Sequence, residues 1–215
     1  MKRSEMSART TAEFYRDTVR KNESGAGGWS KLYYGTLTKV IRDRGFQTVV
    51  EVGIGYGLHA KELLKNTGLR MLYLVDPMKF YPNDGFAQEV LNTVPPVPGG
   101  QFDEMVSLIK AELAPWASRY RWIRKESLTV VPSEISDESV DCVFVDGDHS
   151  YAAVKSDLAF WWKKVRPGGM MLGDDYWMDD VAIAVHEFAL ENNVTLTFAE
   201  NPADPTYKIF QFTKP

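Results

Sequence analysis

The sequence contains a single cysteine, Cys142, among its 215 residues. One cysteine cannot form an intramolecular disulfide, and no Cys/His cluster has the spacing of a structural zinc site. The sequence also has no apolar run near the roughly 18 residues that a membrane-spanning helix needs. Its basic N-terminal segment has no apolar core of the kind found in signal peptides. These absences predict a cytoplasmic protein that does not bind membranes.

An excess of basic residues is also missing. The chain has 25 basic and 29 acidic residues and a formal net charge of -4. Bulk electrostatic binding to nucleic acid is therefore not expected. No repeat of fixed period and no low-complexity tract is present, which excludes a solenoid. The length suits one sizeable core, and the sequence leaves homo-oligomerisation open.

What the sequence does contain is an alternation of apolar and helical segments. Continuously apolar strands, each followed by a helix, are typical of a parallel sheet that helices cover on both faces. The strands are predicted at TVVEVGIG from Thr48, MLYLVD (71–76), YRWIRKES, VDCVFVD (140–146) and MMLGDD, the last after a Pro-Gly-Gly turn at 167–169. TLTFA and YKIFQF close the chain as an antiparallel hairpin. The predicted fold is doubly wound α/β, with the functional residues at the carboxyl ends of the strands.

A glycine-rich turn follows the first predicted strand. Glu51, Gly53, Gly55 and Gly57 form the pattern E-x-G-x-G-x-G, whereas a dinucleotide fingerprint needs a glycine where this chain has Leu58. Glycines let a ligand approach the backbone closely. An acid beside that turn would repel a phosphate, so it indicates a ligand with a positive group such as an amine.

A second acid, Asp76, ends the second predicted strand. An acid at this place can accept hydrogen bonds from the hydroxyls of a ribose. The other interpretation is a carboxylate that only caps a turn. The glycine turn upstream favours the ribose.

These residues carry a family resemblance. EVGIGYG and VDP resemble motifs I and II of class I S-adenosylmethionine-dependent methyltransferases. VDGDHSYAAVKSDL, RPGG and GDDYW resemble the small-molecule O-methyltransferases of methyltransferase family 24. The resemblance spans residues 40–215 and implies a Rossmann-like sheet of seven strands. It also implies a helical lid over residues 1–40, a methyltransferase domain over 41–215, and binding of S-adenosylmethionine by Glu51, Gly53, Gly55, Gly57, Asp76, Ser127 and Asp146.

Three carboxylates follow the fourth and fifth predicted strands: Asp146, Asp174 and Asp175. Converging carboxylates without a cation would repel one another and raise their pKa values. A hard divalent ion resolves that conflict, and oxygen ligands favour Mg²⁺. The arrangement resembles that of metal-dependent catechol and sugar O-methyltransferases. The alternative is that Asp148 and Asp174 cap turns while the other acids are solvated.

His149 lies three residues after Asp146. In similar macrolide-sugar O-methyltransferases a histidine in the same D-x-x-H string is the general base, and an imidazole titrates near neutral pH. We therefore predict His149 and Asp146 as catalytic residues. His59 is predicted to be structural or a wall of the cofactor pocket, and His186 to be solvated. Tyr176 and Trp177 either stack on an acceptor ring or pack in the core.

The sequence thus predicts a metal-assisted O-methyltransferase for a small hydroxylated molecule such as a sugar, a phenol or a natural product. Residues 1–35, 80–104 and 175–180 would determine which acceptor is used. One alternative keeps the fold with other chemistry, as in a hydroxylase-like relative or an aminopropyl transferase. Another is a non-catalytic module that binds S-adenosylmethionine.

Overall fold

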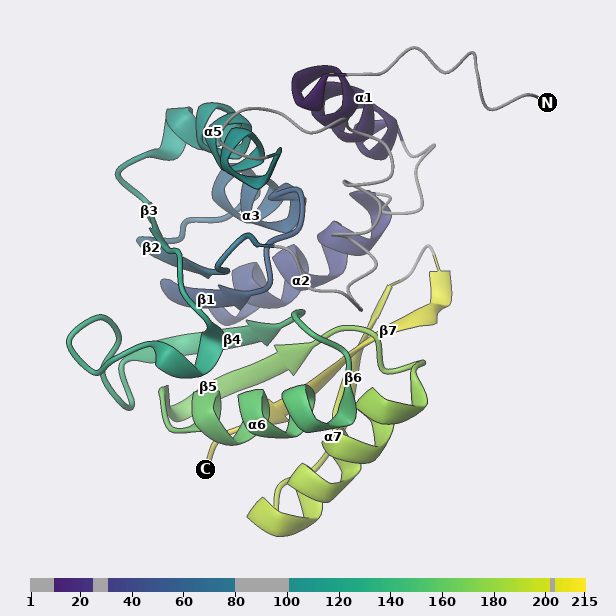
Figure 1. Ribbon diagram of the computed structural model, residues 1–215. Coiled ribbons are helices and arrows are strands. Elements are labelled where there is room, and N and C mark those ends of the chain that lie inside the picture. Colours follow the sequence, from purple (N-terminus) through teal and green to yellow (C-terminus); the bar gives the residue numbers. More distant parts are fainter. Residues whose placement is uncertain (1–9, 25–30, 80–100, 202–203) are drawn as a thin grey trace.

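A seven-stranded sheet between two layers of helices forms the molecule (Figure 1). The computed structural model describes residues 10–24, 31–79, 101–201 and 204–215. Residues 1–9 and 25–30 of the predicted helical lid, and residues 80–100 of the 80–104 segment, lie outside the described residues. In the part of the chain that is described, no helix combines the length and apolar character needed to cross a membrane.

The elements follow the predicted alternation of strands and helices. The strands are β1 (Thr48–Val52), β2 (Met71–Val75), β3 (Tyr120–Ile123), β4 (Val140–Val145), β5 (Val165–Gly173), β6 (Thr197–Asn201) and β7 (Asp204–Thr213). The helices are α1 (Thr11–Glu23), α2 (Lys31–Arg44), α3 (Leu58–Asn66), α5 (Gln101–Leu113), α6 (Tyr151–Trp162) and α7 (Asp179–Asn192). Two short 3-10 turns are η1 (Ala114–Trp116) and η2 (Ser127–Thr129).

The strand order is β3-β2-β1-β4-β5-β7-β6. The first five strands are parallel, and β7 is antiparallel to both β5 and β6. This confirms the predicted Rossmann-like α/β fold with its antiparallel C-terminal hairpin. The order changes direction between β1 and β4, where open parallel sheets bind their ligands beyond the carboxyl ends of the strands.

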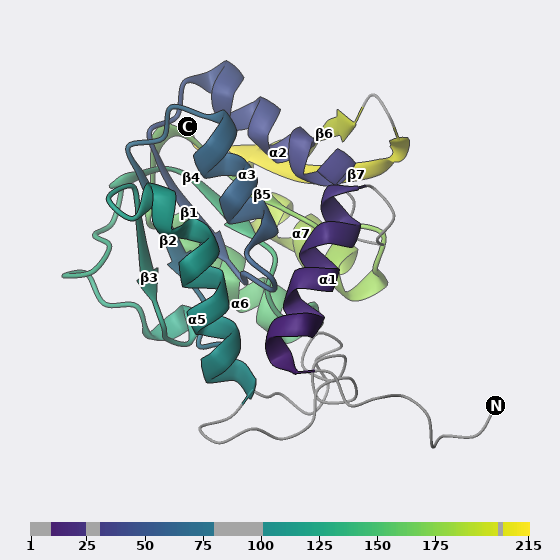
Figure 2. The ribbon, with the colours of Figure 1, turned by 90° about the horizontal axis from the view of Figure 1, so that it is seen from above.

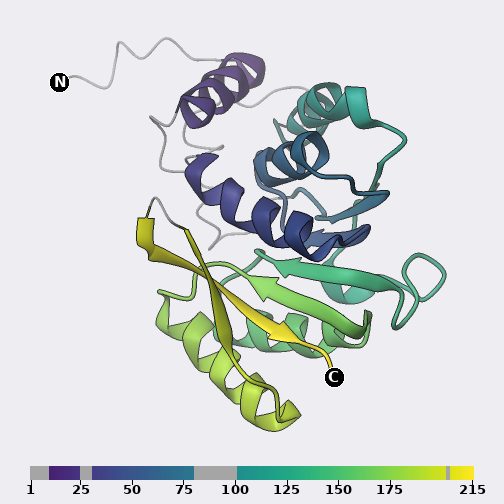
Figure 3. The ribbon, with the colours of Figure 1, turned by 180° about the vertical axis from the view of Figure 1, so that it is seen from behind.

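Two hydrophobic clusters flank the sheet. α1, α2, α3 and α5 cover one face, with Leu37, Leu63 and Ile109 packed against alternate residues of the central strands. α6 and α7 cover the other face, where Leu158 and Val185 are completely buried. Figures 2 and 3 show these two helical layers from above and from behind. Because both faces are covered, the central strands β1, β2 and β4 are mainly apolar, with Glu51 in β1 and Asp141 in β4 as their charged residues.

α1 belongs to the same core as the sheet. It begins with a capping box in which the Thr10 hydroxyl accepts the Glu13 N–H and the Glu13 carboxylate accepts the Thr10 N–H. Phe14 and Tyr15 are buried in the cluster, and the Tyr15 hydroxyl donates to the Tyr56 carbonyl in the glycine turn over 3.3 Å. The N-terminal helix is therefore in direct contact with the predicted cofactor loop.

The third strand is shorter than predicted. It ends at Ile123 rather than running to Ser127, which instead begins η2. The reason is the partner strand, because Ile123 pairs with Val75 at the very end of β2. In the described part of the chain, no neighbouring strand continues beyond that pair to extend the ladder.

The fifth strand begins earlier than predicted. It starts at Val165 and includes the Pro-Gly-Gly segment that the sequence analysis placed in a turn before it. The register with β4 moves from Val140–Val165 to Cys142–Met170, so the extra residues form a bulge. The Lys214 carbonyl accepts the Gly168 N–H, which ties this bulge to the C-terminal strand.

Candidate functional site

The glycine turn lies at the carboxyl end of β1 and leads into α3. Gly53 has a φ of 82°, and a Cβ there would lie 2.0 Å from the Asp146 carbonyl oxygen. The turn therefore packs directly against the loop after β4, which only glycine allows. Gly55 has a φ of 50°, and no atom of the described chain lies within 4 Å of its Cβ position. Gly55 thus leaves room for a ligand at the predicted cofactor loop.

Glu51 is buried beneath this turn with 1% of its surface exposed. Its Oε2 atom has no hydrogen-bond partner among the residues that the structure describes. Burial raises the pKa of Glu51 well above its ordinary value, and the negative charges of Asp146 and Asp76 raise it further. A buried carboxylate whose negative charge is disfavoured in this way fits a positively charged ligand group such as an amine, which would balance that charge.

Asp76 connects the end of β2 to the glycine turn. Its Oδ2 atom accepts the Ile54 N–H over 2.8 Å, and its Oδ1 atom accepts the Met78 N–H over 2.6 Å. The predicted ribose-binding acid therefore lies beside the predicted cofactor loop, on the adjacent strand. The hydrogen bonds of the Asp76 carboxylate to Ile54 and Met78 hold the glycine turn and the end of β2 in a fixed arrangement.

Asp146 follows β4 and lies between two histidines. Its Oδ2 atom is 3.6 Å from His59 Nδ1, and its Oδ1 atom is 3.7 Å from His149 Nε2. Burial alone would raise the pKa of Asp146, but the two histidines outweigh burial and lower it. His59 is buried and packs edge-on against Tyr34 and Phe144. Its contact with Asp146 was not predicted, because only the close approach of the glycine turn to β4 brings the two together.

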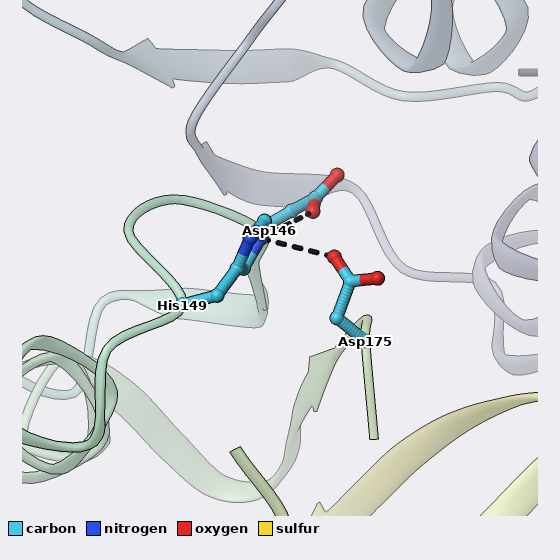
Figure 4. Close-up of side chains that lie close together, drawn as sticks. All are labelled: Asp146, His149 and Asp175. Carbon is cyan, nitrogen blue, oxygen red and sulfur yellow. Dashed lines mark ion pairs between the residues drawn. The ribbon is translucent and has the colours of Figure 1, made fainter. Parts of the chain in front are cut away.

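Asp146, His149 and Asp175 form a cluster whose ligand atoms all lie within 4.8 Å of one another. His149 Nε2 lies 3.0 Å from Asp175 Oδ2, and Figure 4 shows the imidazole between the two carboxylates. Burial lowers the pKa of His149, but Asp146 and Asp175 outweigh burial and raise it to about 10. In this arrangement the imidazolium is the cation that balances the carboxylates.

Asp174 was predicted with Asp146 and Asp175 as a metal ligand, and it lies outside the cluster of three. Its Oδ2 atom accepts the Tyr207 hydroxyl over 2.7 Å, and its Oδ1 atom accepts the Asp175 N–H over 2.7 Å. Burial, with the charges of Asp146 and Asp175, raises the pKa of Asp174 to about 7. Tyr207 comes from β7, and no sequence signal indicated that it would reach this acid.

Ser127 also has partners that the sequence did not reveal. Its hydroxyl donates to Asp157 Oδ1 over 2.5 Å and accepts the Trp161 indole N–H over 2.7 Å. Asp157 and Trp161 are one helical turn apart on α6 and are both buried. This network lies on the helix that follows the Asp146 loop.

The two aromatic residues after the acid pair differ in exposure. Tyr176 packs edge-on against Phe198, and its hydroxyl lies 2.8 Å from His186 Nε2. Trp177 is 78% exposed, and its indole N–H donates to Asp175 Oδ1 over 2.8 Å. Trp177 is therefore an exposed ring fixed at the edge of the acidic cluster.

A family model described as a methyltransferase domain matches residues 50–176, more than half of the chain. The match covers the glycine turn, Asp76, Ser127 and the acidic residues after β4 and β5. Among curated proteins, R132 of Acanthamoeba polyphaga mimivirus is 36% identical over 56 residues. That alignment covers 24% of this chain and 25% of the viral protein, so the chain matches about a quarter of this relative's length.

Solved structures show the same fold at low sequence identity. A candidate caffeoyl-CoA O-methyltransferase from Staphylococcus aureus superimposes with a TM-score of 0.63 and 13% identity, covering 96% of this chain and 93% of that one. The O-methyltransferase TomG from Streptomyces achromogenes, in complex with SAM, superimposes with a TM-score of 0.60 and 13% identity. The match covers 98% of this chain and 92% of TomG. The N-methyltransferase NodS from Bradyrhizobium japonicum, in complex with S-adenosylhomocysteine, superimposes with a TM-score of 0.58 and 13% identity. The match covers 96% of this chain and 100% of NodS.

Proposed function

This chain belongs to the methyltransferase domain family as a class I S-adenosylmethionine-dependent methyltransferase, and we propose that it methylates a hydroxyl of a small molecule with the help of a divalent cation. The neighbouring folds include both O- and N-methyltransferases, so the fold leaves the accepting atom open. The observation that carries the proposal is the cluster of Asp146, His149 and Asp175 beside the glycine turn. Two acids and a potential base at one point suit removal of a hydroxyl proton.

The cofactor site fits S-adenosylmethionine, which supplies an activated methyl group when bound. The buried carboxylate of Glu51, whose Oε2 atom has no hydrogen-bond partner among the described residues, is suited to the amino group of the methionine part. The open space at Gly55 lets that part approach the backbone. Asp76, on the next strand, would accept hydrogen bonds from the ribose hydroxyls.

The acidic cluster fits a divalent cation such as Mg²⁺. Asp146 and Asp175 offer carboxylate oxygens, and Asp174 lies beside them with a pKa that burial, and then the charges of Asp146 and Asp175, raise to about 7. Carboxylates are the ligands that hard cations prefer. A cation held here would lower the pKa of an acceptor hydroxyl next to it.

His149 has two possible roles in this proposal. As the general base it would take the acceptor proton, which requires its pKa to fall from about 10 toward neutral pH. Neutralisation of Asp146 and Asp175 by a cation would have that effect, because those two carboxylates raise the pKa. The position of Nε2 among the carboxylate oxygens also suits a nitrogen ligand of the cation.

The acceptor is proposed to carry a ring. Trp177 is exposed at the edge of the cluster, and its hydrogen bond to Asp175 holds the indole in place. An exposed aromatic ring next to polar groups suits stacking on a sugar or a phenol. The net charge of -4 gives no support for a nucleic-acid substrate.

The test is a methyl-transfer assay with S-adenosylmethionine and a panel of sugars, phenols and amines, with and without Mg²⁺ after treatment with a chelator. We expect transfer to one class of hydroxylated acceptor that disappears in chelator and returns with Mg²⁺. Full activity in chelator would refute the role of the cation. Transfer to amines alone would refute the O-methyltransferase assignment and leave the methyltransferase assignment intact.

A further inference from the structure

Ser127, Asp157 and Trp161 form a hydrogen-bonded network that the proposed mechanism does not use. Asp157 is 6% exposed, and its carboxylate accepts the Ser127 hydroxyl. Trp161 is completely buried, and its indole N–H donates to the same hydroxyl oxygen. A charged residue of this kind in the interior is costly to bury, so its partners determine its role.

The chemistry of the three groups fixes the direction of both hydrogen bonds. An indole N–H can only donate, and an ionised carboxylate can only accept. Burial raises the pKa of Asp157 to about 6, with Asp148 adding to the effect, and this value still leaves the carboxylate ionised at neutral pH. The single proton of the Ser127 hydroxyl is therefore committed to Asp157. One lone pair remains on the oxygen, so Ser127 can offer a ligand an acceptor but no donor.

The position of Ser127 in the fold is where the base of a bound nucleoside would lie. β3 is next to β2, and Asp76 at the end of β2 is the proposed ribose site. Ser127 follows β3, one strand farther from the glycine turn. Asp157 Oδ2 lies 3.9 Å from the Cβ position of Gly147, so the network also reaches the loop after β4. Leu128, next to Ser127, is 49% exposed and offers an apolar surface for a flat ring.

We propose that Asp157 is a positioning residue that fixes the Ser127 hydroxyl as an acceptor, so that the site selects a 6-amino purine over a 6-oxo purine. The inference rests on the proposed binding of S-adenosylmethionine. The exocyclic amine of adenine donates to the remaining lone pair of Ser127. The carbonyl oxygen of a 6-oxo purine at the same place meets that lone pair without a proton between them. Removing the carboxylate in Asp157→Ala would take away the acceptor of the Ser127 proton, so the hydroxyl could turn and donate to the ligand instead.

The experiment compares calorimetric binding of S-adenosylhomocysteine with binding of its 6-oxo analogue, S-inosylhomocysteine. The wild-type protein is expected to prefer the adenosyl compound by about 10–100-fold, the value of one hydrogen bond and the avoided repulsion. Asp157→Ala is expected to reduce that preference to about threefold or less, with a native circular dichroism spectrum. The matched control is Asp148→Ala, which removes a neighbouring charge from a residue that has no described hydrogen bond to Ser127. This variant is expected to keep the preference.

Ser127→Ala tests the acceptor directly and does not depend on folding of the Asp157 variant. It is expected to weaken binding of the adenosyl compound while binding of the inosyl compound stays equal or improves. A merely structural role would weaken both compounds alike. The double variant is expected to show no further loss of preference than Ser127→Ala, because Asp157 acts through Ser127.

Two outcomes separate this inference from the proposed function. Equal binding of both compounds by the wild-type protein, or an unchanged preference in folded Asp157→Ala, would overturn the inference and leave the cofactor assignment standing. Binding of neither compound by the wild-type protein would overturn the cofactor assignment and the inference together.

Discussion

At the scale of single residues, Glu51 is an acid that the protein buries without a partner for one of its oxygens among the described residues. Its pKa is raised by burial, and then by Asp146 and Asp76, so an ionised Glu51 destabilises the free protein. That cost appears as the pH rises through the raised pKa, because the folded state holds the proton more tightly than the unfolded state. A cationic ligand group bound next to Glu51 would remove this energetic cost.

We expect Glu51→Gln to change stability and binding in opposite directions. The free variant should melt at a higher temperature than wild type at about pH 8, because glutamine avoids the cost of either burying a charge or holding a proton on the acid. Binding of S-adenosylhomocysteine should weaken by about 1.5–3 kcal/mol, the range for a hydrogen bond to a charged group. Thermal melts and calorimetry measure the two effects. Unchanged affinity would show that Glu51 does not contact the ligand.

His149 gives a residue-scale prediction that separates its two possible roles. If it is the general base, His149→Ala should bind Mg²⁺ and S-adenosylhomocysteine as wild type does while the methyl-transfer rate falls by roughly 10²–10⁴-fold. If Nε2 is a ligand, Mg²⁺ binding by the variant should weaken as well. Calorimetry with Mg²⁺ alone measures this without an acceptor. A variant with full activity would exclude both roles.

At the scale of elements, the turn between β1 and α3 contains two glycines that differ in what surrounds them. A Cβ at Gly53 would overlap the Asp146 carbonyl at 2.0 Å, whereas a Cβ at Gly55 would project into open space. Gly53→Ala should therefore destabilise the protein by about 3 kcal/mol or more. Gly55→Ala should cost only the about 1–2 kcal/mol of a left-handed alanine, and should weaken binding of S-adenosylhomocysteine by at least tenfold, or about 1.4 kcal/mol.

Denaturant unfolding and calorimetry on the matched pair test this distinction. Equal losses of stability would contradict the packing argument for Gly53. Retained affinity in Gly55→Ala would contradict the proposal that the open space belongs to the cofactor. Both variants start from positive-φ glycines, so backbone strain is common to the two and the difference reports the surroundings.

The same turn shows why part of the site could be predicted from the sequence. Glu51, the glycines and the start of α3 lie within one strand-turn-helix segment, so their spacing along the chain determines their arrangement in space. The acids after β4 and β5 were also predictable, because neighbouring parallel strands end at the same edge of a sheet. Their local patterns identify the family as well.

The contacts that depend on distant segments were not predictable in this way. Tyr207 reaches Asp174 only because the chain returns to place β7 against β5. Ser127 meets Asp157 because α6 packs beside η2, and the end of β3 at Ile123 is set by the length of β2. Asp175 has a φ of 55°, which no sequence pattern indicated, and it accepts the N–H of Trp177 and pairs with His149.

At the scale of the whole molecule, the acidic cluster links stability to pH and to the cation. Burial opposes the charge of His149, but Asp146 and Asp175 outweigh burial and raise its pKa to about 10. A raised pKa contributes stability that is complete below the ordinary value near 6.5 and is lost as the pH approaches 10. Burial and the neighbouring acids raise the pKa of Asp174 from 3.8 to about 7, so this group also lowers stability as the pH rises from its ordinary pKa toward 7. The pKa shifts of His149 and Asp174 therefore both lower the stability of the protein as the pH rises.

We therefore expect the metal-free protein to melt at a lower temperature at about pH 9 than at about pH 6, and Mg²⁺ to remove most of that difference. The cation takes over the balancing charge of the imidazolium and binds more tightly as protons leave, so its stabilising effect grows with pH. Melting curves at both pH values, in chelator and in Mg²⁺, measure this difference in melting temperature.

Two histidine variants serve as test and control. His149→Ala should flatten the pH dependence of the melting temperature in chelator. His186→Ala changes an exposed histidine bonded to Tyr176 and should leave that pH dependence unchanged. An equal Mg²⁺ shift at both pH values would show that the cation does not replace the proton on His149, and no shift at either would show that the cluster holds no cation.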